Sequence, residues 1–118
     1  MKKLILACDD DEDILEVIKI ILESKNYNVI TCCEEEEIVD IVKDKRPDLI
    51  LLDIWMSTKD ITQTLEKIRA IENFNSRVIL VSALNNIREI SENNKVYGFL
   101  PKPFSVEKLL DVVEKGLE

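Results

Sequence analysis

Short apolar runs alternate with longer stretches of helical periodicity along the whole chain. The apolar runs have the length of strands, and an unbroken run is typical of a strand buried on both faces. The longer stretches carry apolar residues three or four positions apart, as one face of a helix requires. Strands are expected at 4–8, 28–32, 48–53, 77–82 and 97–100, and helices at 11–24, 34–44, 61–72, 85–93 and after an N-cap at Ser105.

This (βα)5 alternation predicts an α/β fold. Right-handed crossovers between consecutive strands give a parallel sheet with helices on both faces, which makes a three-layer sandwich. A chain of 118 residues has room for one core, and no repeat or linker divides it. We therefore expect 1–118 to be a single domain. The first helix is expected to face the core with Ile14, Val17, Ile18, Ile21 and Leu22.

Charge and hydropathy exclude several classes of function. The net charge of −8 repels nucleic acid phosphates and anionic lipid, so no direct nucleic-acid or membrane contact is expected. No apolar run approaches the roughly 18 residues that span a bilayer. The first residues turn acidic too early for the apolar segment of a signal peptide, and we expect the cytoplasm.

Rare residue types exclude further sites. The absence of histidine excludes a His-ligated metal and a Ser-His-Asp triad. The two glycines, Gly98 and Gly116, are too few for a glycine-rich dinucleotide loop or a P-loop. Cys8, Cys32 and Cys33 do not make a disulfide framework and would need a carboxylate to hold zinc. We expect all of them to be buried and chemically ordinary.

Polar residues stand at the carboxyl ends of four expected strands. Asp9 and Asp10 follow the first strand, Asp53 ends the third, Ser82 ends the fourth and Lys102 follows the fifth. Each of them has an ordinary explanation when taken alone. The acidic pair could simply begin a helix and Asp53 could be an N-cap, while the serine could be a turn residue and the lysine a solvated surface residue. In a parallel sheet, however, the carboxyl ends meet at one edge, where ligands bind. The convergence therefore predicts a site.

The chemistry of that site follows from charge. Carboxylates packed together stay ionised only beside a cation, and oxygen ligands without histidine suit Mg2+. A carboxylate can also act as a nucleophile and form an aspartyl phosphate. Lys102 and the Ser82 hydroxyl would then help Mg2+ to neutralise the phosphoryl oxygens. We interpret Asp53 as the phosphoryl acceptor.

The acidic pair after the first strand and the segments LLDIWM, VSA and LPKPF together resemble the receiver domain of two-component response regulators. The resemblance covers essentially the whole chain. It implies a flavodoxin-like sheet of strand order 2-1-3-4-5. It also implies Mg2+-dependent transfer of a phosphoryl group to Asp53 from a histidine kinase or a phosphotransfer protein. Such a chain catalyses its own phosphorylation and dephosphorylation and is not a metabolic enzyme.

The resemblance implies a metal site. Asp10, Asp53 and the backbone carbonyl of Trp55 would bind Mg2+. Asp9 would hold a metal-bound water and face Lys102.

The resemblance also implies a switch. Ser82 and Lys102 would stabilise the phosphoryl group, and Ser82 and Phe99 would change position together. The surface of the fourth helix, fifth strand and fifth helix would then change, and an effector domain or protein would bind the changed surface. A homodimer formed on phosphorylation is compatible with this.

Trp55 and Leu84 flank the site and are predicted to restrict the access of attacking water to the phosphate.

Three departures from the family pattern fall outside the acceptor. At the switch, Phe99 stands where tyrosine is more common, but it retains the packing role. The loop after Asp53 has Ser57 where a proline is common, and Ile61 follows Asp60 where glycine is common. The stretch before Gly98 is about two residues short.

Two other functions share part of this pattern. A haloacid-dehalogenase-like phosphatase also uses a strand-end aspartate, but it needs a second aspartate where this chain has Trp55. A degenerate receiver that only binds partners would lack some of the required side chains, which are all present.

Overall fold

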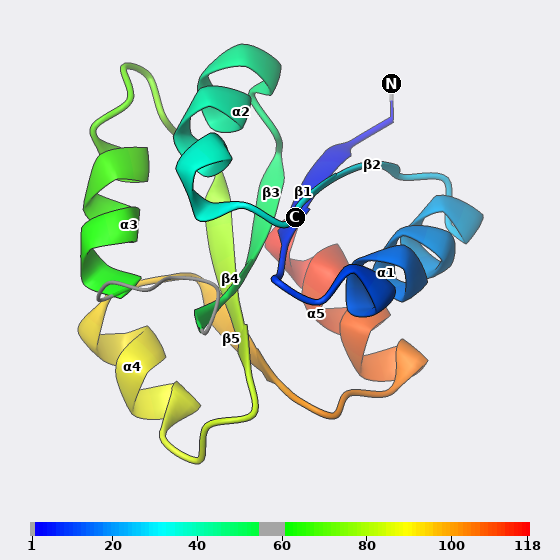
Figure 1. Ribbon diagram of the computed structural model, residues 1–118. Coiled ribbons are helices and arrows are strands. Elements are labelled where there is room, and N and C mark those ends of the chain that lie inside the picture. The colour runs from blue at the N-terminus through cyan, green and yellow to red at the C-terminus, as the bar shows by residue number, and fades with distance from the viewer. Residues whose placement is uncertain (1, 55–60) are drawn as a thin grey trace.

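The computed structural model describes residues 2–54 and 61–118. Within them, five parallel strands form one sheet of order β2-β1-β3-β4-β5 (Figure 1). The strands are β1 Leu4–Cys8, β2 Asn28–Cys32, β3 Leu49–Asp53, β4 Arg77–Ser82 and β5 Gly98–Pro101. The helices are α1 Glu12–Ser24, α2 Ile38–Lys45, α3 Ile61–Arg69, α4 Ile87–Asn93 and α5 Val106–Gly116, with a 3-10 turn η1 at Glu35–Glu37. The predicted fold class and strand order are confirmed.

The sheet separates two hydrophobic cores. Helices α1 and α5 cover one face, and α2, α3 and α4 cover the other (Figure 1). Successive residues of a strand point to opposite faces, so Ile5 and Ala7 enter one core while Leu6 and Cys8 enter the other. Every residue of β3 is buried. The unbroken apolar run at this strand thus reflects burial on both sides.

The burial of α1 differs from the prediction. Val17 was expected to face the core but is 51% exposed, whereas Leu15 is buried. The helix begins at Glu12, with the Asp11 carboxylate accepting hydrogen bonds from two amides of the first turn, and it presents Leu15, Ile18 and Leu22 to the sheet. Apolar residues occur nearly all round this helix, so their spacing alone does not select the inward face.

Several element bounds also differ by a few residues. The second predicted helix opens as the 3-10 turn η1, where no side chain caps the first glutamates. Helix α3 ends at Arg69, because Ile71 hydrogen-bonds to Ile68 and Asn73 then takes a left-handed φ of 62°. Helix α4 begins two residues late, at Ile87. In the part of the chain that the structure describes, no helix is long and apolar enough to cross a membrane.

Ser105 caps α5 as predicted, since its hydroxyl accepts a hydrogen bond from the Lys108 amide at 3.1 Å. Replacing Ser105 by alanine leaves that amide without its acceptor, and we expect a loss of about 1 kcal/mol in the free energy of unfolding. Urea denaturation measures the loss, and Ser105→Asp, which keeps an acceptor, serves as the control. Equal stabilities for wild type and Ser105→Ala would show that the cap contributes nothing.

Candidate functional site

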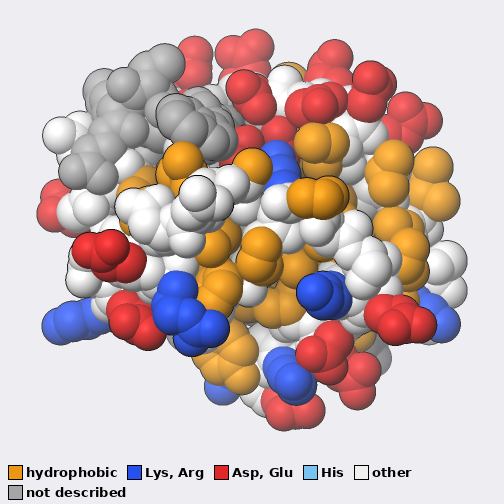
Figure 2. Space-filling view, turned by 90° about the horizontal axis from the view of Figure 1, so that it is seen from below, with side chains coloured by type: hydrophobic (Ala, Val, Ile, Leu, Met, Phe, Trp, Pro, Cys, Tyr) orange, Lys and Arg blue, Asp and Glu red, His pale blue; other side chains and the backbone are white. Residues whose placement is uncertain are grey.

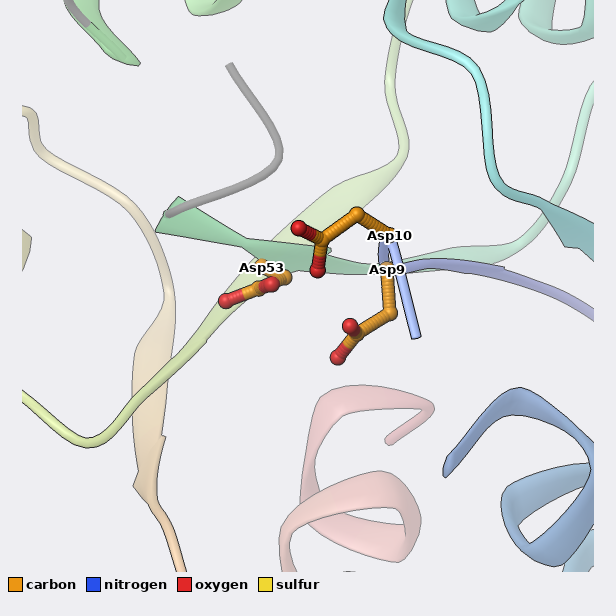
Figure 3. A group of neighbouring side chains, drawn as sticks. All are labelled: Asp9, Asp10 and Asp53. Atoms are coloured by element: carbon orange, nitrogen blue, oxygen red, sulfur yellow. The ribbon is translucent and has the colours of Figure 1, made fainter. Parts of the chain in front are cut away.

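Three carboxylates meet at the carboxyl edge of the sheet. Asp9 and Asp10 follow β1 and Asp53 ends the neighbouring β3, and one oxygen from each lies within 4.8 Å of the others (Figure 3). Asp9 and Asp53 are each 2% exposed, whereas Asp10 is open to solvent. The structure thus brings the predicted acids together, two of them in a poorly hydrated position.

Lys102 reaches this cluster from the end of β5. Its Nζ lies 2.7 Å from Asp9 Oδ2 and 3.7 Å from Asp53 Oδ1. The second oxygen of Asp9 accepts a hydrogen bond from the Asp11 amide at 2.9 Å, so the Asp9 carboxylate is held from two sides. Lys102 brings one positive charge to three carboxylates, and these four side chains keep a net negative charge. That charge and an all-oxygen donor set fit a hard divalent cation.

The backbone around Lys102 is fixed by its neighbours. The Lys102 amide donates a hydrogen bond to the Ser82 carbonyl at 2.8 Å, which extends the pairing of β4 with β5. The Lys102–Pro103 peptide bond is cis. The hydrogen bond to the Ser82 carbonyl places Lys102 beside the end of β4.

Ser82 lies beside Asp53 on the adjacent strand. In the register of β3 with β4, Asp53 pairs with Val81, and Ser82 is the next residue. Ser82 is fully buried, and its Oγ accepts a hydrogen bond from the Leu84 amide at 3.0 Å. A hydroxyl that accepts such a bond keeps its own proton for donation. Leu84 itself is half-buried.

Phe99 lies on β5, opposite Leu80 of β4, and is half-buried. The guanidinium of Arg88, on α4, stacks over its ring at 5.1 Å from the centroid. Sequence reasoning missed Arg88, because the contact joins a helix to a strand and no local spacing encodes it. Trp55, Ser57 and Asp60, which also carried predictions, lie outside the described residues.

The cysteines only partly match the expectation of burial. Cys8 and Cys32 are buried, but Cys33 is exposed. A hydrogen bond to Cys32 raises the pKa of Cys8, and burial adds to the rise. The same hydrogen bond lowers the pKa of Cys32 to about 7, against the opposing effect of burial. These two thiols are therefore a coupled pair.

The surface around the site has two distinct regions. Viewed from the carboxyl ends of the strands, acidic side chains gather along one side of the molecule and hydrophobic ones near the middle (Figure 2). An acidic hollow of about 790 Å³ is lined by Asp10, Asp11, Glu12, Asp13, Cys33 and Glu34. An apolar groove of about 450 Å³ is lined by Asp13, Ile14, Val17, Ala83, Lys102, Pro103 and Phe104. The carboxylate cluster thus opens onto a predominantly acidic surface.

Known proteins are similar to this chain in sequence and in fold. Residues 5–114 match the model of the response regulator receiver domain. The nisin biosynthesis regulatory protein NisR of Lactococcus lactis is 35% identical over 116 residues, which are 97% of this chain and 50% of that protein. The sporulation initiation phosphotransferase F of Bacillus subtilis is 29% identical over 119 residues, covering 99% of this chain and 95% of that protein.

A solved structure gives the same result. A CheY-like response regulator receiver domain protein from Methanospirillum hungatei superposes with a TM-score of 0.88 at 27% identity, covering 99% of this chain and 94% of that one. The chain spans only about half the length of NisR. The matched family model, the strand order and the relatives agree: the chain belongs to the receiver domains of two-component response regulators.

Proposed function

We propose that Asp53 accepts a phosphoryl group, in a Mg2+-dependent transfer from a histidine kinase or a phosphotransfer protein. The observation that carries the proposal is the cluster of Asp9, Asp10 and Asp53, with Lys102 reaching two of its members. A relative of nearly the same length is named a phosphotransferase, which supports transfer as the chemistry.

The three carboxylates would have different roles in binding the metal. Asp10 and Asp53 would bind Mg2+ directly, and the backbone carbonyl of Trp55 would complete the protein ligands. Asp9, already held by Lys102 and the Asp11 amide, would hold a metal-bound water. When bound, Mg2+ supplies the positive charge that compensates the acids and orients the phosphoryl oxygens.

Transfer then uses the side chains of this chain. A carboxylate oxygen of Asp53 attacks the phosphorus, and the bond from phosphorus to the donor's histidine nitrogen breaks, with its electron pair staying on that nitrogen. The Lys102 ammonium, 3.7 Å from Asp53 Oδ1, pairs with a phosphoryl oxygen. The Ser82 hydroxyl donates to another oxygen.

The phosphorylated state would change the output surface. Drawing the Ser82 hydroxyl toward the phosphoryl group weakens the hydrogen bond that it accepts from the Leu84 amide. Phe99, one strand away, would then repack, and the surface of α4, β5 and α5 would select an effector or a second copy of the chain. No direct binding to nucleic acid is expected, and the cytoplasmic location stays a prediction.

Intact mass spectrometry tests the proposed acceptor chemistry. Acetyl phosphate with Mg2+ should add one phosphate, because a small phosphoryl donor needs only the metal and the acceptor. A chelator should prevent the addition. Protein that is folded and binds Mg2+ but gains no phosphate would contradict the proposal.

Trp55 and Leu84 are proposed to slow loss of the phosphate by excluding water. If the Trp55 side chain contributes about 1 kcal/mol to this barrier, Trp55→Asn should speed dephosphorylation roughly five-fold. Trp55→Leu keeps an apolar side chain and serves as the matched control. Phosphate loss followed by mass over time measures both, and an unchanged rate in Trp55→Asn would remove Trp55 from this role.

A further inference from the structure

Two thiols lie side by side where β1 and β2 end. Cys8 and Cys32 are Cα partners in the register of these neighbouring strands. Each is 3% exposed, and both enter the same hydrophobic cluster, so their side chains leave the same face of the sheet.

This placement suits a disulfide. Adjacent strands are about 4.8 Å apart, which falls within the roughly 4.4–6.8 Å between the Cα atoms of disulfide-bonded cysteines. The Cβ atoms of a disulfide are closer, at about 3.8 Å, so bond formation draws the two strand ends together. A bond formed under such tension is more easily reduced than an unstrained one.

We propose that Cys8 and Cys32 form a reversible disulfide when the protein meets a peroxide. The Cys32 sulfur attacks one peroxide oxygen and becomes a sulfenic acid, and the displaced hydroxide takes the thiol proton to give water. The Cys8 sulfur then attacks the sulfenic sulfur, and the hydroxide displaced there takes the Cys8 proton to give a second water. The two thiols together lose two electrons, and one peroxide gains them and is reduced to two waters.

The path for the oxidant leads through the loop after β2. Strand β2 is at the edge of the sheet, and the Cys32 thiol donates a hydrogen bond to the Glu34 carbonyl at 3.1 Å. Residues Cys33 and Glu34 are exposed, so a local opening of this short loop uncovers Cys32 without unfolding the sheet.

The disulfide also acts on the carboxylate cluster, a consequence that rests on the proposed function. Cys8 immediately precedes Asp9, and the Asp9 amide donates a hydrogen bond to the Cys32 carbonyl at 3.1 Å. Drawing the end of β1 toward β2 moves Asp9 and Asp10 away from Asp53, which lies on β3 on the other side of β1. Oxidation therefore weakens Mg2+ binding.

Peptide mapping tests the disulfide independently of phosphorylation. Folded Cys33→Ser protein is treated with hydrogen peroxide, denatured in the presence of an alkylating agent, and digested. We expect a mass loss of about 2 Da, because two hydrogens leave, together with a peptide pair linking Cys8 to Cys32. Dithiothreitol should restore both thiols. The wild type, with Cys33 present, should give the same linked pair.

Two results would overturn the disulfide: Cys8 remaining fully alkylatable on denaturation, or bonds forming only through Cys33. Cys32→Ala is the matched negative control, because it lacks one of the two thiols. If Cys32→Ala does not fold, the peptide map of Cys33→Ser protein still decides the question.

Mg2+ titration of reduced and oxidised Cys33→Ser protein, followed by Trp55 fluorescence, tests the coupling. We expect weaker binding in the oxidised form. Equal affinities would overturn the coupling alone. Failure of the reduced protein to bind Mg2+ would instead count against the proposed function.

Discussion

Asp53→Asn is expected to abolish phosphate incorporation from acetyl phosphate, with a fall of at least about 100-fold, because an amide is not a nucleophile of this kind. Asparagine has nearly the shape of aspartate, so the buried strand end keeps its packing. Asp9 is a poor substitute acceptor, because its two oxygens already accept hydrogen bonds from Lys102 and the Asp11 amide. Intact mass after incubation with Mg2+ measures the effect.

Asp111→Asn is the matched control for this substitution. Asp111 is an exposed carboxylate on α5, paired with Lys115, and its loss should leave phosphorylation unchanged. If Asp53→Asn protein still gains one phosphate at the wild-type rate, the acceptor is another residue. Mapping the modified peptide would then show whether Asp10 takes its place.

Lys102→Met is expected to lower the free energy of unfolding by about 3 kcal/mol in the absence of Mg2+. Lys102 is 2.7 Å from Asp9, and the two side chains are only 19% and 3% exposed. Removing one partner of a buried ion pair leaves the other charge uncompensated, which costs about 3–5 kcal/mol. Methionine keeps most of the apolar stem, so the loss reports the charge.

Added Mg2+ should recover part of this loss, because a cation at the carboxylates replaces some of the missing positive charge. The stabilisation by Mg2+ should be larger in Lys102→Met than in the wild type. Urea denaturation with and without Mg2+ measures both quantities, and Lys108→Met, at an exposed lysine on α5, controls for the substitution itself. Equal loss of stability in the two variants would contradict a structural role for the Lys102–Asp9 pair.

Much of the fold could be predicted because the apolar pattern of each segment and the rules for connecting strands lead to the same arrangement. Unbroken apolar runs identified the strands, and right-handed crossovers then placed Asp9, Asp10 and Asp53 at one edge of the sheet. Ser82 and Lys102 were found in the same way, from strand ends alone. The residues of the candidate site are far apart in the sequence, but each stands at the carboxyl end of a strand. A parallel sheet brings these ends close together.

The remainder depends on tertiary packing. Helix α1 is apolar on so many sides that only its docking on the sheet decides between Leu15 and Val17. The stacking of Arg88 on Phe99 requires the placement of α4 against β5. The cysteine pair depends on the register of β1 with β2, and two short strands separated by a helix do not reveal their register locally.

Asp53 and its neighbouring acids are proposed to form a magnesium-dependent phosphoryl site. The most direct measurement is a titration with beryllofluoride, a phosphoryl mimic, in the presence of Mg2+, followed by the fluorescence of Trp55, the only tryptophan. We predict a saturable change that requires Mg2+ and disappears in Asp53→Asn. Folded wild-type protein with no magnesium-dependent response, or an unchanged response in Asp53→Asn, would contradict the claim.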